Sequence, residues 1–181
     1  MHELIGNELY QAITYARGLD EQAGRRLLAQ FQQEQPGLAQ TLLEIFPSII
    51  AEHDQDMAYL FMDLCFDVLC IFQKAFGPLP TLQQMDKEWL EKQAALLETE
   101  FQAVLNGQTM DPKLRAELQD RMQKRGLADN SQPALLKILL ETIDDFSAES
   151  PKRVNATEIC QNLIRVVVHM FGQLYTHKIT A

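Results

Sequence analysis

The sequence predicts an all-α protein, a single bundle of about seven to eight helices. Apolar side chains recur three or four residues apart along most of the chain, strand-like alternation is never sustained, and glycine and proline fall mainly between the periodic segments. The 181 residues, of which 46% are hydrophobic and 23% charged, can build one well-buried core and are too few for two. We therefore predict that residues 1–181 form a single helical domain.

The predicted helices in the first half of the chain are bounded by residues that begin or end helices. They span about residues 2–17, 21–35, 38–46 and 47–76. Gly18 ends the first helix, and Asp20 caps the second. Pro47 is either the first residue of the fourth helix or a kink within a continuous one.

The predicted helices in the second half follow the turn Gly77-Pro78-Leu79-Pro80. They span about residues 81–106, 112–125, 133–146 and 155–176. Thr81 with Gln84 has the spacing of a capping box, which begins a helix. Asn155 with Glu158 has the same spacing and predicts the start of the last helix.

Two of these helices, 47–76 and 155–176, are apolar around most of their circumference, which is typical of helices that other helices surround. We therefore place both at the centre of the bundle. Each has one narrow polar strip, acidic on the first helix and containing basic residues on the second. The first strip holds Glu52, Asp56, Asp63, Asp67 and Lys74, and the second holds Glu158, Arg165 and His169.

The strips have three interpretations, and the first two need no ligand. In the first, each strip is the part of its helix that reaches water, because a carboxylate is seldom buried without a partner. In the second, the strips meet in an ion-pair site, inside the monomer or across a two-fold dimer interface. The residues of that site are Asp56, Asp63, Asp67, Arg165 and His169.

In the third interpretation, the acidic strip binds a ligand or a metal ion. The candidate metal ligands are His53, Asp56, Asp63 and Asp67. Helical bundles do bind metal ions between carboxylates, but the diiron pattern needs a glutamate three residues before a histidine on two helices. Neither His53 nor His169 has one. We therefore predict no resident cofactor and keep a divalent metal ion as an alternative.

The charge of the chain argues against two classes of partner. The net charge is −9, and the acidic residues are spread along the sequence. A nucleic-acid-binding surface needs clustered Lys and Arg, and an anionic membrane surface attracts the same residues. The most apolar stretch, residues 57–76, contains three charged residues, each of which costs roughly 2.5–3.5 kcal/mol at the bilayer centre. We therefore expect neither nucleic acid nor a membrane as a partner.

The three cysteines predict a reducing compartment. Their number is odd, and none forms a CxxC pair. The first residues include acids where a secretory signal would have bases. We therefore expect a cytoplasmic protein.

The predicted function is a non-catalytic helical binding or structural module that forms a homodimer, because apolar residues on the two central helices exceed what one ring of helices covers. One alternative is a metal-dependent hydrolase of phosphorylated small molecules. Its carboxylates would come from the acidic strip or from acids three residues apart, Glu88 with Glu91 and Glu141 with Asp144. A second alternative is a sensor or carrier of an apolar ligand. Its pocket would be lined by Met57, Met62 and Phe66.

Overall fold

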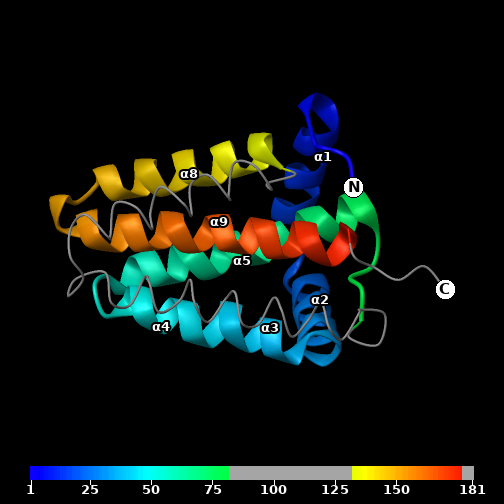
Figure 1. Ribbon diagram of the computed structural model, residues 1–181, viewed down its shortest axis with the longest axis horizontal. Coiled ribbons are helices and arrows are strands. Elements are labelled where there is room, and N and C mark those ends of the chain that lie inside the picture. Colours follow the sequence, from blue (N-terminus) through cyan, green and yellow to red (C-terminus); the bar gives the residue numbers. More distant parts are fainter. Residues whose placement is uncertain (82–131, 177–181) are drawn as a thin grey trace.

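The computed structural model describes residues 1–81 and 132–176, and every regular element in these two ranges is helical (Figure 1). The all-α fold is therefore confirmed. The elements are α1 (Gly6–Arg17), α2 (Glu21–Glu34), α3 (Pro36–Gln40), a π-helical segment (Thr41–Ile45), α4 (Phe46–Ala51), α5 (Gln55–Phe76), α8 (Pro133–Ala148), a 3₁₀ turn (Pro151–Arg153) and α9 (Val154–Thr176).

The predicted number of helices, about seven to eight, is not confirmed. The α3, π-helical and α4 segments follow one another without a break, so the described residues form six helical runs. The helices predicted at about residues 81–106 and 112–125 lie outside the described residues.

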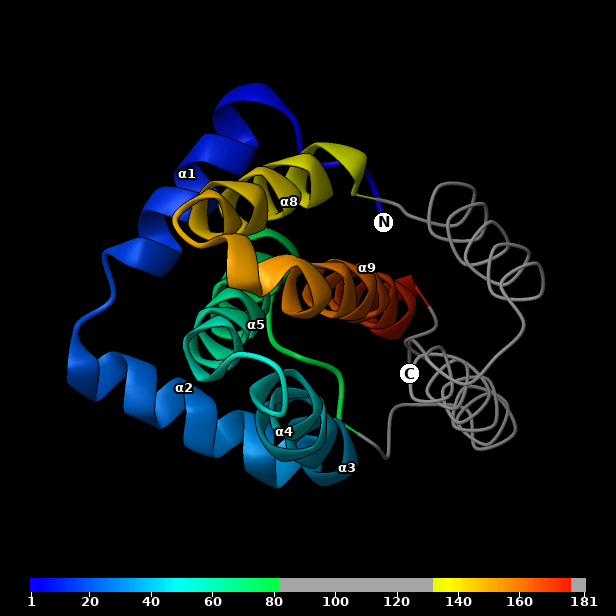
Figure 2. The same ribbon diagram turned by 90° about the vertical axis from the view of Figure 1, so that its left-hand side faces the viewer.

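The helices α5 and α9 pack side by side, and the other described helices lie along several of their sides (Figure 2). The neighbours of α5 are α1, α4, α8 and α9, and α9 also packs on α8 and α4. The helices α1 and α2 run across the long direction of α5 and α9 at one end of the bundle. The apolar character of α5 and α9 explains this arrangement, because such helices need neighbours on several sides.

The core contains an aromatic cluster where α2, α5 and α9 meet. Phe72 has its ring centre 5.5 Å from that of Phe171 and 5.8 Å from that of Tyr175. Phe31 of α2 extends the cluster through Phe171, at 6.1 Å. Tilted aromatic pairs at these distances add a little to the free energy of burying the rings, about 0.5–1.5 kcal/mol each.

The predicted helix 47–76 is wrong, because the chain leaves the helical conformation between Ala51 and Gln55. Asp54 is extended, with φ −158° and ψ 117°, and caps α5 by accepting a hydrogen bond from the Met57 backbone N–H at 2.8 Å. An aspartate stabilises a helix more as its N-cap than in its interior, where its side chain competes for backbone groups. The two halves of the predicted helix are therefore α4 and α5.

Pro47 lies near the start of α4, within the continuous run from Pro36 to Ala51. A proline inside a helix lacks an N–H donor and its ring collides with the carbonyl four residues back. Directly before it, the backbone N–H of Phe46 donates to the Thr41 carbonyl five residues back, as in a π-helix. The wider π turn alters the carbonyl spacing just where the proline joins the helix.

Two predicted helix starts are also wrong. The first helix begins at Gly6, since Ile5 is extended and the Leu4 N–H and His2 carbonyl are hydrogen-bonded to Gln132. The last begins at Val154, directly after the 3₁₀ turn, so Asn155 lies in the first turn and is not its cap.

Other boundaries are confirmed. Asp20 caps α2 by accepting from the Ala23 N–H at 2.7 Å, and α8 begins at Pro133. Gly77, with φ +88°, ends α5 in a conformation that favours glycine. Within the described ranges, no helix is both long and apolar enough to cross a bilayer.

Candidate functional site

The acidic strip of α5 lies partly in water and partly under α1. Asp56 and Asp63 are exposed, whereas Asp67 is half-buried. Burial raises the pKa of Asp67, the charge of Arg17 at the end of α1 lowers it, and the nearby Asp63 carboxylate raises it again. The helix α1 therefore brings a basic residue, Arg17, near Asp67.

A second contact of α1 lies one heptad further along the same strip. The Lys74 ammonium lies 5.1 Å from the centre of the Tyr15 ring, in a cation–π contact. Cys70, between Asp67 and Lys74 in the sequence, is fully buried. Because α1 packs on α5, it partly covers Asp67, while Asp63 and Lys74 remain exposed.

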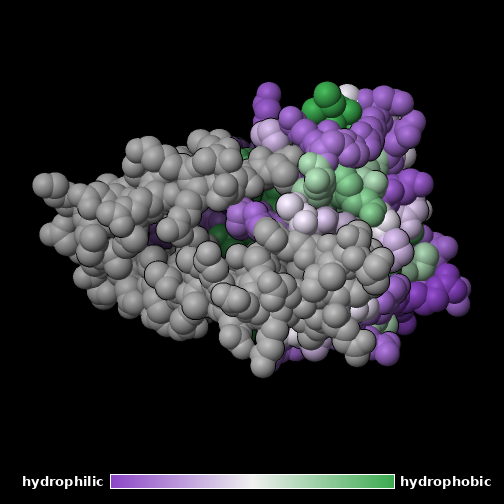
Figure 3. All heavy atoms as spheres, turned by 45° about the vertical axis from the view of Figure 1, so that its right-hand side comes forward, coloured by the Kyte–Doolittle hydropathy of each residue, from purple (hydrophilic) through white to green (hydrophobic). Residues whose placement is uncertain are grey.

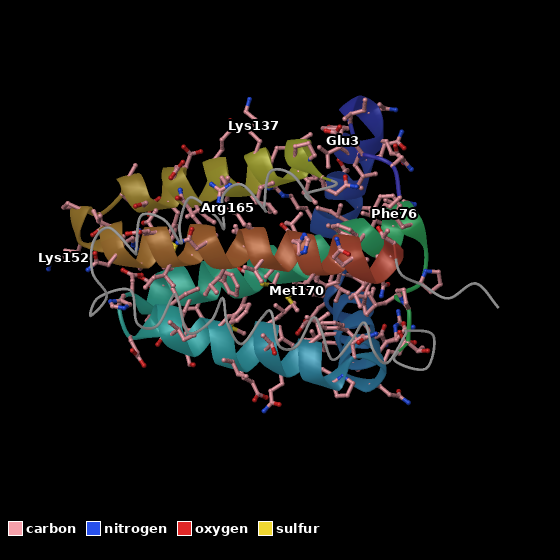
Figure 4. All side chains as sticks on the ribbon, viewed as in Figure 1. Glu3, Phe76, Lys137, Lys152, Arg165 and Met170 are labelled. Atoms are coloured by element: carbon pink, nitrogen blue, oxygen red, sulfur yellow. The ribbon has the colours of Figure 1, made fainter. Side chains whose placement is uncertain are left out.

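The strip of α9 faces a different neighbour. Arg165 is half-buried and extends toward α8 (Figure 4). Burial lowers its pKa and the charge of Asp144 on α8 raises it. Asp144 also accepts a hydrogen bond from the Gln161 amide at 2.6 Å. One turn beyond Arg165, His169 is half-buried, and its buried Nδ1 has no hydrogen-bond partner among the described residues.

The structure does not bring the two predicted strips together within the monomer. No ion pair among the described residues joins Asp63 or Asp67 to α9. The basic residue that acts on Asp67 is Arg17, and the acid that acts on Arg165 is Asp144. A meeting of the strips across a dimer interface stays a prediction.

The four candidate metal ligands are not gathered either. His53 is exposed in the break before α5, Asp56 lies in the first turn, and Asp63 and Asp67 follow two and three turns later. In residues 1–81 and 132–176, no three His, Cys, Asp or Glu side chains are close enough together to hold a metal ion.

The acid pairs of the hydrolase alternative have two different outcomes. Glu88 and Glu91 lie outside the described residues. Glu141 pairs with Lys137 at 3.7 Å on the exposed face of α8, while Asp144 is turned to α9.

Sequence reasoning missed the residue with the most ionic contacts in the described part of the chain, Arg153. Its side chain is only 11% exposed. The Nε–H donates to Oδ2 of Asp54 at 3.3 Å, and Nη2–H donates to Oδ2 of Asp56 at 3.4 Å. Both acceptors belong to the beginning of α5.

The remaining contacts of Arg153 reach the end of α8. Its Nη1–H donates to the Phe146 carbonyl at 2.9 Å and to Oε2 of Glu149 at 3.3 Å. The guanidinium carbon lies 4.0 Å from the centre of the Phe146 ring. We call Arg153, Asp54, Asp56, Glu149 and Phe146 the Arg153 cluster. It ties the start of α5 to the end of α8 and the start of α9.

The Arg153 cluster was not predicted from the sequence. Glu149 and Arg153 are four residues apart, but both lie between the predicted helices 133–146 and 155–176, where this spacing does not indicate a pair on one helix. Asp54 and Asp56 lie almost one hundred positions earlier and were assigned to the interior of a long helix, which hid the role of Asp54 as a cap.

The three cysteines do not offer a nucleophile. Cys65, Cys70 and Cys160 are free and buried. Burial raises the pKa of Cys70 and of Cys160 to about 12, and raises that of Cys65 as well. A thiol reacts as its thiolate, so these side chains are protonated and unreactive at neutral pH.

Comparison with protein-family models, with curated proteins and with solved structures gives no match.

Proposed function

We propose that this protein is a non-catalytic helical interaction module of the cytoplasm that functions as a homodimer. The observation that carries the proposal is the distribution of exposed large apolar side chains. Seven are exposed among the described residues, and four of them lie within the first fifteen positions. These four are Met1, Ile5, Tyr10 and Tyr15.

Such a concentration of apolar surface favours a protein–protein contact, because water is released when a second surface covers it. The space-filling view shows green side chains among purple ones at the α1 end of the molecule (Figure 3). Tyrosine is enriched in interfaces, since its ring gives a large contact area with few rotatable bonds.

The contacts and burial of several ionisable side chains support a non-catalytic role. The Arg153 guanidinium holds three carboxylates and a backbone carbonyl that connect helices. The three thiols are buried and protonated. These groups are therefore engaged in the fold, and free buried thiols fit a reducing cytoplasm.

The proposal is tested by native mass spectrometry and light scattering on the full chain. We expect a dimer with no bound metal or small molecule. A bound divalent metal ion would favour the hydrolase, and a bound apolar molecule would favour the carrier. A monomer at every accessible concentration would refute the homodimer.

A pair of exposed tyrosines allows a test of where the interface lies. Tyr10 on α1 is 69% exposed, and Tyr59 on α5 is 58% exposed. We expect Tyr10→Asp to raise the dimer dissociation constant at least about tenfold, because a charge would be buried without a partner. The matched control Tyr59→Asp should leave it within about twofold, a shift well below the 1.4 kcal/mol that one decade represents. Equal effects of the two variants, measured by analytical ultracentrifugation, would place the interface elsewhere.

A further inference from the structure

Residues 2–4 precede α1 and are hydrogen-bonded to one buried side chain, that of Gln132. The Leu4 backbone N–H donates to Oε1 of Gln132 at 2.8 Å. Nε2–H of the same amide donates to the His2 carbonyl at 2.8 Å. A single carboxamide thus recognises the backbone of two alternate residues, as a neighbouring strand does in β-augmentation.

Side chains fix the position of this segment. Leu4 and Gln132 are both 0% exposed. The His2 ring packs edge-on against Phe76 at the end of α5, with the ring centres 5.4 Å apart. Nε2 of His2 lies 2.9 Å from the Glu8 carboxylate, where both side chains are exposed. We call the place that this segment occupies the groove; it contains the Gln132 amide before α8 and the buried Leu4 side chain, and Phe76 at the end of α5 lies beside it. Figure 4 shows Glu3 and Phe76 at this end of the molecule.

The connection from this segment to α1 makes few contacts. Ile5 is extended and 60% exposed, and it forms no side-chain cap on α1. Gly6 has φ +55°, the left-handed conformation that favours glycine. A connection of this kind can change direction at low cost, because little buried surface or hydrogen bonding is lost.

We propose that the groove at Gln132 binds the His2–Leu4 segment of a second copy, so that two chains exchange this segment reciprocally. The inference rests on the proposed homodimer and names the contact that builds it. A second copy is the partner that the geometry favours, since its segment has the leucine and the backbone spacing already seen in the groove. The segment makes the same local contacts in its own groove and in that of a second copy. Ile5 and Tyr10 are exposed in the single chain, and their burial between two copies favours the exchanged arrangement.

Cross-linking between two single variants tests the exchange. Glu3 and Pro133 are both exposed and flank the groove, Glu3 within the segment and Pro133 directly after Gln132. Glu3→Cys protein is mixed with Pro133→Cys protein and treated with bismaleimidoethane, while the three native thiols are buried. We expect a covalent dimer of one chain of each kind, seen by mass spectrometry of the denatured product.

Two further variants give the control. Adding Leu4→Asp to the Glu3→Cys protein should reduce the mixed cross-link at least about tenfold, because a carboxylate cannot occupy the buried leucine site. Adding Asn7→Asp, which places the same charge on an exposed position, should leave it unchanged. Circular dichroism checks that each variant keeps its helices.

The outcomes that contradict the exchange are distinct from those that contradict the homodimer. A dimer in light scattering without the mixed cross-link would refute the exchange and leave the homodimer standing. Cross-linking only when both cysteines are in one chain would show that the segment stays in its own groove. If the full-length Leu4→Asp protein binds a peptide of residues 1–8 but no mixed cross-link forms, the groove accepts peptides and not a second copy.

Discussion

Asp67 is a carboxylate whose surroundings favour its protonated form. Its ordinary pKa is 3.8, and burial raises it despite the opposing charge of Arg17. The folded state therefore holds this proton more tightly than the unfolded chain does. Stability consequently falls as pH rises from the unfolded pKa through the raised folded pKa.

The variant Asp67→Asn removes this carboxylate and keeps its shape. At pH 7 we expect the free energy of unfolding to be unchanged or higher by up to about 0.5 kcal/mol, and its fall with rising pH above about 4 to be reduced. Urea denaturation between pH 3.5 and 7 measures both. The exposed Glu52→Gln should change neither. A loss of more than about 1 kcal/mol in Asp67→Asn would mean that this carboxylate has a strong positive partner.

Arg153 differs from Asp67 because its charged group is surrounded by hydrogen-bond acceptors. Its side chain is only 11% exposed. We expect Arg153→Met to lower the free energy of unfolding by about 2–3 kcal/mol, because the Asp54 carboxylate, only 20% exposed, and the Phe146 carbonyl each lose a charged donor. Arg153→Lys should recover less than half of this, since an ammonium cannot reach both ends of the cluster at once. The exposed neighbour Lys152→Ala should stay within about 0.5 kcal/mol. Full recovery by lysine would mean that charge alone matters here.

At the scale of the helices, the two aspartate caps form a natural comparison. Asp20 and Asp54 each accept a backbone N–H three residues on, at 2.7 Å and 2.8 Å. Only Asp54 also pairs with an arginine. We expect Asp20→Ala to cost about 1 kcal/mol and Asp54→Ala about 2–3 kcal/mol, measured by urea denaturation. Equal costs would show that Asp54 acts as a cap alone.

The helix boundaries that were predicted correctly are those that depend on residues within one turn of the boundary. Asp20 and Gly18 act within one turn, so their chemistry is visible in a short stretch of sequence. The break before α5 was not predicted, because Pro47 suits the start of a long helix. The residue that caps the start of α5 is Asp54. The π-helical segment that leads into Pro47 has no sequence signature.

The ionic contacts were harder to predict because they join distant parts of the chain. Asp67 lies near Arg17 and Asp54 pairs with Arg153, and in both cases the partner belongs to another helix. Helical periodicity shows which residues share a face of one helix and does not show which helix covers that face. The two polar strips were therefore found, but their neighbours were not.

For the whole molecule, the net charge of −9 sets how dimerisation responds to salt. Two acidic copies repel each other, and salt screens this repulsion. We expect the dimer dissociation constant to fall severalfold as ionic strength rises from about 0.01 M to about 0.1 M, where the Debye length shrinks from roughly 30 to 10 Å. Analytical ultracentrifugation across this range measures it. Weakening by salt would instead indicate an interface built on opposite charges.

The packing of α5 against α9 has a consequence for the synthesis of the protein on the ribosome. The helix α5 ends at Phe76 and α9 begins at Val154, so 77 residues lie between them. At roughly 5–20 residues per second, synthesis of that stretch takes about 4–15 s. During those seconds the apolar sides of α5 have no α9 to cover them, and the nascent chain offers chaperones a hydrophobic helix to bind.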